Sequence, residues 1–220
     1  MKDFQTTILI DLSKTKEELW NALDRSRRKN INKAGENKLS IEEIDIYASG
    51  HGLYFSDFYN LYRKVWAHGG IEVDSYDTLR DRLMNKGYKF FLCFKDGKII
   101  GGAMICENYP GRWKFSIVAC DSAYNEFRPN DFLYWYLILY IKSLGAKFCD
   151  LGGYQEKPKD NLIGVNRFKE MWGGQIHRDE IEGNVLKMIG RKAFRNIPLV
   201  RKVVNKIKGR KSTVFKPKNN

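Results

Sequence analysis

The alternation of apolar and polar residues along the chain predicts a sheet flanked by helices. Strands are expected at residues 6–12, 39–46, 88–94, 98–106, 112–120 and 175–181. Helices are expected where apolar residues recur every three or four positions, at 15–35, 53–66, 76–85 and 132–144. Asp96-Gly97 separates two of the strands and predicts a tight hairpin, because its turn needs positive φ. This order predicts a mixed α/β sheet, of the α/β or α+β class.

A further short strand is expected around Asp150, and its end is the candidate ligand site. It ends at Gly152-Gly153, where the backbone is expected to open sharply because glycine accepts positive φ freely. Ligands usually bind at such a strand end in an open α/β sheet. After a polar loop, Phe168-Lys169 precedes another glycine pair. A cation held near a crevice suits a reaction that develops an oxyanion.

The composition of the chain indicates one globular domain that binds a polyanion. The 220 residues suit one globular domain, expected at 1–183, and 43% hydrophobic residues can form its core. The net charge of +13 favours tRNA, a nucleotide diphosphate or an anionic membrane surface as partner. From 184 to 220 basic residues alternate with apolar ones and no acidic residue occurs. We expect a basic amphipathic helical tail there, with 184–216 contacting an anionic membrane or RNA, or packing on the domain.

The positions of the cysteines and histidines argue against disulfides and a metal site. The first residues bear on localisation. The four cysteines lie inside apolar runs without a C-x-x-C pair, so buried free thiols are expected. The three histidines have no metal-ligand spacing, and no metal is expected. Met1-Lys2-Asp3 begins the chain without an apolar run. We therefore expect a cytoplasmic protein, peripheral on the inner membrane face if the tail binds lipid.

Several short motifs in register together resemble a known family. They are Asp150-Leu151-Gly152-Gly153, Phe168-Lys169, Gly173-Gly174, Asp131-Phe132-Leu133-Tyr134-Trp135 and Asn30-Ile31-Asn32-Lys33-Ala34. This set is similar to the Fem (FemABX) family of aminoacyl-tRNA-dependent peptidoglycan transferases, whose domains have the GNAT acyltransferase fold. Family members usually carry two such units, whereas one fits here. The resemblance implies a GNAT-like fold and transfer of an aminoacyl group to an amine of a cell-wall peptide or glycan precursor.

The resemblance also implies roles for particular residues. Lys169 is expected to contact the aminoacyl end of the tRNA and steady the developing negative charge, beside Phe168. Asp150 either accepts a proton from the amine or holds the glycine loop, and the family pattern favours holding. The remaining expected substrate contacts are the strand-end glycines, two tyrosines and three basic residues for phosphate: Gly152, Gly153, Tyr154, Tyr134, Arg28, Lys29 and Lys33.

The donor is expected to be aminoacyl-tRNA, with no bound cofactor. GNAT proteins that use acetyl-CoA have a glycine-rich turn before the helix expected at 132–144, whereas residues 124–130 contain no glycine and include Glu126. One alternative is a GNAT-type N-acyltransferase that uses acyl-CoA or acyl carrier protein on an amino sugar or lipid-linked glycan. Another is a non-catalytic basic domain that binds tRNA or membrane.

Overall fold

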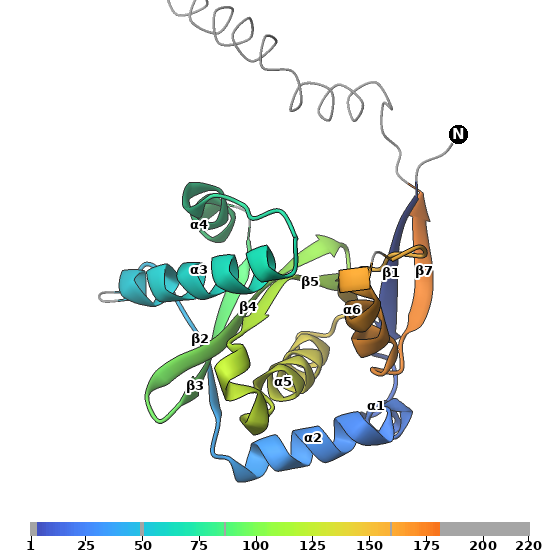
Figure 1. Cartoon of the computed structure of the whole chain (residues 1–220). Helices are drawn as coiled ribbons and strands as arrows, with labels where there is room; N and C mark the ends of the chain where they lie inside the picture. The colour runs from blue at the N-terminus through green and yellow to red at the C-terminus, as the bar shows by residue number, and fades with distance from the viewer. Residues whose placement is uncertain (1–3, 49–50, 86, 159, 181–220) are drawn as a thin grey trace, which may run out of the picture. The chain divides into compact units, whose positions relative to one another are not determined.

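Figure 1 shows the computed structural model of the chain, which describes residues 4–48, 51–85, 87–158 and 160–180. One compact unit spans Thr6–Arg178. The tail expected at 184–220 lies outside the described residues. In chain order the elements are β1 (Phe4–Asp11), α1 (Lys16–Ala22), α2 (Arg25–Glu36), β2 (Ser40–Glu43), α3 (His51–His68), α4 (Tyr76–Asn85), β3 (Lys89–Lys95), β4 (Lys98–Tyr109), β5 (Arg112–Cys120), η1, a 3-10 helix (Ser122–Phe127), α5 (Pro129–Ser143), β6 (Phe148–Gly153), α6 (Asp160–Glu170) and β7 (Gln175–Glu180).

The described strands form one mixed sheet in the order β2-β3-β4-β5-β6-β1-β7. Strands β2 to β5 pair antiparallel in succession, and β6 pairs antiparallel with β1. The pair β5 and β6 is parallel, because the chain leaves β5, crosses one face of the sheet as α5 and returns as β6. On its other side, β6 lies next to β1, so the first strand of the sequence is placed between β6 and β7.

Helices cover both faces of the sheet, which explains why its central strands are apolar nearly throughout. On β3, Phe90, Leu92 and Phe94 pack into the cluster that contains α3 and α4, while Phe91 packs into the cluster that contains α5. Successive side chains of a strand point to opposite faces, so this alternation places β3 between two layers. Figure 1 shows α3 and α4 on one side of the sheet and α5 on the other, with α1 and α2 beyond α5.

The predicted helix at 15–35 is wrong in one respect, because it is two helices. Its start is confirmed: Thr15 and Glu18 form the expected capping box, with the Thr15 N–H donating to the Glu18 carboxylate at 2.7 Å. The first helix then ends, since Leu23 is extended and Asp24 begins a new helix by accepting from the Ser26 N–H at 2.7 Å. The second helix ends at Glu36, one residue past the glycine expected to stop it.

Other expectations hold or fail locally. The Asp96-Gly97 hairpin is confirmed, with φ of 49° and 75° at its two residues. The helix α6 and the 3-10 helix η1 were not expected, and the strand expected at 39–46 shortens to β2. All four cysteines are buried free thiols, as expected, and burial raises the pKa of the Cys93 thiol to about 12. Within the described part of the chain, no helix combines the length and apolar character needed to cross a membrane.

Candidate active site

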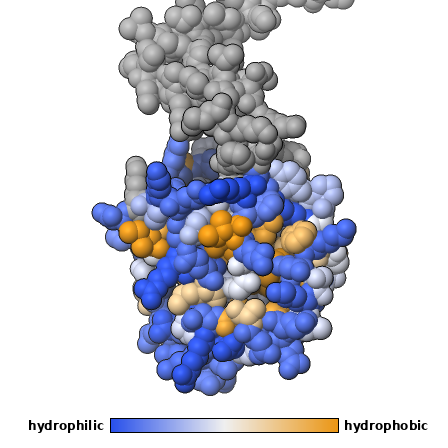
Figure 2. Space-filling view, turned by 90° about the vertical axis from the view of Figure 1, so that its right-hand side faces the viewer, coloured by the Kyte–Doolittle hydropathy of each residue, from blue (hydrophilic) through white to orange (hydrophobic). Residues whose placement is uncertain are grey.

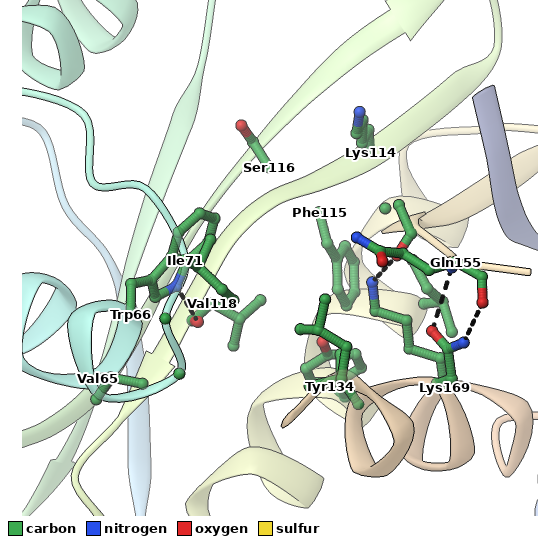
Figure 3. A pocket seen from close by; sticks show the side chains of 18 residues that line it. Val65, Trp66, Ile71, Lys114, Phe115, Ser116, Val118, Tyr134, Gln155 and Lys169 are labelled. Carbon is green, nitrogen blue, oxygen red and sulfur yellow. Dashed lines mark hydrogen bonds between the residues drawn. The ribbon is translucent and has the colours of Figure 1, made fainter. Parts of the chain in front are cut away.

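A pocket opens where the parallel strands β5 and β6 separate. Their pairing covers Arg112 to Lys114 against Phe148 to Asp150 and goes no further. Beyond it, Phe115, Ser116 and Val118 on one strand and Leu151 to Gly153 on the other contribute to a pocket of about 630 Å³. The remaining walls come from the end of α3 and the loop after it, from Tyr134 of α5 and from α6 (Figure 3). The carboxyl ends of two diverging parallel strands are where the sequence predicted a crevice.

Asp150 joins the two strands at the point where they separate. The residue is 1% exposed, and its carboxylate faces Arg112 of β5, which is 7% exposed and donates from Nη2 at 2.6 Å and Nε at 3.0 Å. The other carboxylate oxygen accepts from the Gly152 N–H at 2.8 Å and from the Thr7 hydroxyl of β1. Because both oxygens are already engaged, the arrangement favours the holding role of Asp150 over the alternative of a proton acceptor.

Gly152 is required by the geometry of the strand end. Its φ is +77°, and a Cβ at this position would lie 2.9 Å from the Phe115 carbonyl oxygen. The backbone therefore turns away from β5 without a side chain that would fill the opening. The next residue, Gly153, has no such constraint, but its carbonyl points to the site and accepts a hydrogen bond from Lys169.

Lys169 of α6 lies in the pocket beside this glycine turn, as the sequence predicted. Its Nζ donates to the Gly153 carbonyl at 2.7 Å and would lie 3.8 Å from a Cβ on Gly152. Part of the side chain is exposed, but the ammonium end is largely surrounded by protein atoms. Its pKa is lowered to about 8, mainly by burial; the charge of Asp150 opposes this shift and the charge of Lys114 adds to it. A partly desolvated cation therefore faces the pocket.

The structure separates the aromatic residues that were expected to contact substrate. Tyr134 does line the pocket, and burial raises its pKa. Phe168 instead packs in the core, edge-on to Tyr134 with ring centroids 4.9 Å apart, and under the Arg27 guanidinium at 5.0 Å. Tyr154 is not part of the pocket lining, and its hydroxyl donates to Glu170 at 2.6 Å. Of the three, only Tyr134 lines this pocket, and the contact of Phe168 and Tyr154 with substrate is not supported by their positions, since Phe168 packs against the core and Tyr154 bonds to Glu170.

The basic residues expected to contact phosphate lie on α2 and are absent from the pocket lining. Arg28 is engaged within the fold, since its guanidinium donates to the carbonyls of Asn21 at 3.0 Å and Leu23 at 2.8 Å and so caps the end of α1. Lys29 and Lys33 are exposed on the same helix. Their contact with phosphate stays a prediction, at a surface separate from the pocket.

Several pocket residues were missed by the sequence analysis. Lys114 and Ser116 lie on the pocket side of β5, two positions apart, which the alternation of that strand could have revealed. Asn166 is 6% exposed and fixes the loop after β6, since its amide donates to the Gln155 carbonyl at 2.6 Å. Trp66 and the loop that follows α3 form the far wall, and no local pattern distinguishes them from core residues.

The first turn of α5 carries a buried carboxylate. Arg128 precedes the helix in a left-handed conformation with φ of 61°, and Pro129 is the first helical residue. In that first turn Asp131 is 4% exposed, with its carboxylate 2.7 Å from Arg27 of α2 and accepting from Asn30 at 3.3 Å. A carboxylate in the first turn lies near the positive end of the helix dipole, where an anionic ligand would also bind.

Comparison with known proteins matches the fold and not the sequence. No family model and no curated protein sequence matches the chain. Similar solved structures are FemX (TM-score 0.68, 14% identity, 84% of this chain and 63% of that chain) and the C-terminal domain of a putative lysylphosphatidylglycerol synthetase from Agrobacterium fabrum (0.56, 14%, 81% and 60%). L-PGS from Bacillus licheniformis is similar to the same degree (0.56, 14%, 86% and 64%).

The chain thus spans about three fifths of the length of each of these neighbours. At such identities the likeness concerns the fold alone. The expected GNAT-like mixed α/β fold is confirmed, and the Fem resemblance drawn from short motifs is matched by a Fem structure.

Proposed function

We propose that the chain is an acyltransferase that forms an amide bond, with aminoacyl-tRNA as donor and an amine of a cell-wall peptide or glycan precursor as acceptor. The observation that carries the proposal is the Lys169 ammonium, partly desolvated beside the Gly152 turn in a pocket between two diverging strands. The names of the structural neighbours, FemX and lysylphosphatidylglycerol synthetase, support aminoacyl transfer as the class of reaction.

In the proposed reaction the acceptor amine attacks the carbonyl carbon of the aminoacyl ester. A C–N bond forms, the ester C–O bond breaks, and the proton lost by the amine ends on the ribose oxygen that leaves. Negative charge develops on the carbonyl oxygen in between, and Lys169 can stabilise it, because a charge interaction is stronger where protein replaces water. Asp150 holds the strands in place through Arg112 and takes no proton.

The choice of donor is supported by the start of α5. In GNAT proteins that use acetyl-CoA, backbone N–H groups at this place hold the pyrophosphate. Here the first turn of α5 carries Asp131, a buried carboxylate that pairs with Arg27. A pyrophosphate brought there would lie close to this carboxylate, and like charges repel each other. An acyl group carried by tRNA needs no such pyrophosphate site.

The test is a transfer assay with purified full-length chain. Charged tRNA and acyl-CoA are each incubated with lipid-linked peptidoglycan precursor, and label transfer is followed by mass spectrometry. We expect transfer from charged tRNA and its loss in Lys169→Met, whereas Lys98→Met, an exposed strand lysine outside the pocket, retains it. Transfer from acyl-CoA but not from charged tRNA would show that the donor is acyl-CoA. Transfer from neither would favour a non-catalytic domain that binds tRNA or membrane.

A further inference from the structure

The loop that follows β6 is fixed at a residue whose main chain is bound on both sides. The Asn166 amide of α6 donates to the Gln155 carbonyl at 2.6 Å, and its oxygen accepts from the Gln155 N–H at 3.3 Å. Asn166 is 6% exposed, so these bonds are sheltered from water, where hydrogen bonds are electrostatically stronger. Gln155 itself is exposed. A buried side chain therefore holds the main chain of an exposed glutamine.

The Gln155 side chain lies in the pocket on the same side as Lys169. Both residues line the pocket, and in Figure 3 the Gln155 side chain points toward the ammonium end of Lys169. The hydrogen bonds agree with this view, since Lys169 donates to the carbonyl of Gly153, two residues before Gln155. Asn166 lies one helical turn before Lys169 on the same face of α6. Within the part of the chain that the structure describes, no hydrogen bond engages the Gln155 side-chain amide.

Two hydroxyl groups also line the pocket, but neither is placed as the Gln155 amide is. The Ser116 hydroxyl is hydrogen-bonded to Tyr88, and in Figure 3 Ser116 lies away from Lys169. Tyr134 is 7% exposed, and its ring belongs to the hydrophobic core. Of these three residues, Gln155 is the one that brings a neutral donor to Lys169.

We propose that the Gln155 side-chain amide is a second donor to the oxyanion of the reaction, and that Asn166 positions it. This inference rests on the proposed function, because it concerns the same reaction. As the amine adds to the acyl carbon, one electron pair of the C=O bond moves onto the oxygen, and it returns when the bond to the leaving group breaks. In between, the Lys169 ammonium and the Gln155 Nε2–H both donate to that oxygen. The same charge develops whether tRNA or CoA carries the acyl group.

A second donor complements Lys169 in two ways. One of the three N–H groups of the ammonium is already used by the Gly153 carbonyl, at 2.7 Å. A charged oxygen accepts a further hydrogen bond along another lone-pair direction, which the amide can supply. The amide is also neutral, so it does not lower the pKa of Lys169 as the positive charge of Lys114 does. Gln155 therefore adds a donor while Lys169 keeps its charge.

The first test is steady-state transfer by the full chain with Gln155→Met, which keeps the length of the side chain and removes the amide. We expect kcat to fall about 10- to 100-fold with little change in KM, because the lost bond forms only in the transition state. Gln175→Met, at an exposed glutamine of β7 outside the pocket, should leave kcat unchanged. The strand β7 lies on the face that Figure 2 shows, whose described surface is mainly hydrophilic.

A double-mutant cycle tests the role of Asn166. Asn166→Leu removes both bonds to the Gln155 main chain and should lower kcat about as much as Gln155→Met. The double variant should lose little more than either single variant, since both changes act on the same amide. A residue that only stabilises the fold would add its effect to that of Gln155→Met. Thermal melting verifies folding, and Asn166→Asp, which keeps the acceptor for the Gln155 N–H, replaces a leucine variant that does not fold.

The position of the amide is tested without transfer. Gln155→Glu puts a carboxylate beside the Lys169 ammonium and should raise the pKa of Lys169 from about 8 toward its ordinary value. Competitive labelling with acetic anhydride over a range of pH, followed by mass spectrometry, measures this pKa. Gln175→Glu should leave the pKa of Lys169 unchanged.

Equal kcat in Gln155→Met and Gln175→Met would overturn the inference and leave the proposed function standing. An unchanged pKa of Lys169 in Gln155→Glu would also overturn it, and additive losses in the double variant would remove the positioning role of Asn166. No transfer by the native protein from either donor would instead overturn the proposed function, and the oxyanion role of Gln155 with it.

Discussion

Replacement of Lys169 by methionine removes a buried positive charge that lowers the stability of the folded protein. A lysine in the unfolded chain titrates near 10.5, whereas burial lowers the pKa of Lys169 to about 8. Between these values the unfolded state binds more protons than the folded state, so the stability of the native protein rises with pH. Methionine lacks this titration. The variant should therefore be relatively most stable at neutral pH and lose its advantage as pH increases.

The magnitude follows from the two pKa values. From about pH 7 to about pH 9.5, the free energy of unfolding of the native protein should rise by about 2 kcal/mol relative to Lys169→Met. Because part of the side chain is exposed, solvent screening reduces this to about 1–2 kcal/mol. The lost hydrogen bond to the Gly153 carbonyl shifts the difference at every pH but does not change its slope.

The assay is urea unfolding of both proteins across this range of pH, with Lys98→Met as control. That exposed lysine should give a difference in unfolding free energy that stays constant over the same interval. In parallel, transfer by the native protein should decline as pH rises through about 8, since the neutral amine no longer stabilises an oxyanion. A Lys169→Met difference that does not vary with pH would refute the claim that this ammonium is desolvated.

Three further substitutions, one of them with a matched control, test the pocket and the predicted phosphate contact on α2. Asp150→Asn leaves the buried Arg112 guanidinium without its carboxylate and should cost about 3–5 kcal/mol in chemical denaturation; a loss below about 1 kcal/mol would contradict the pairing. Gly152→Ala should slow transfer about 10-fold in steady-state kinetics, because the new Cβ meets the Phe115 carbonyl, while Gly153→Ala should have little effect. Arg28→Ala should lower the free energy of unfolding by about 1 kcal/mol in a melting experiment and leave transfer unchanged. If Arg28→Ala instead raised the KM for tRNA without loss of stability, the predicted contact of Arg28 with phosphate would be supported.

The sequence was most informative where one local rule decides the structure. The capping box at Thr15, the turn at Asp96-Gly97 and the apolar alternation of β5 each depend on nearby residues alone. The break at Leu23 was not predictable in this way, because it depends on tertiary contacts: the Asp24 N–H donates to the Met171 carbonyl, far along the chain. The helix propensity of the residues favoured one continuous helix, whereas these tertiary contacts favour two helices.

The candidate site was predicted in part for a similar reason. Gly152 and Lys169 were identified because glycine at a strand end and a cation after it are visible in sequence. The partner of Asp150 was not, since Arg112 lies on a neighbouring strand and no spacing connects them. Phe168 was expected to contact substrate because Phe168-Lys169 resembles a pair of the Fem family. Consecutive residues of a helix point about 100° apart, so Phe168 packs against the core while Lys169 faces the opening.

The position of β1 has a consequence for how the protein is made. The Thr7 hydroxyl bonds to Asp150 across 143 positions of sequence, and β1 pairs with β6 between Thr7 and Asp11. During synthesis the first strand therefore waits without its partner until nearly the whole unit has emerged. Pairing over such a distance is slow, and an unpaired apolar strand invites association with other chains. Competence for ligand binding should thus appear as the last event of folding, after the antiparallel strands have assembled on α3 and α5.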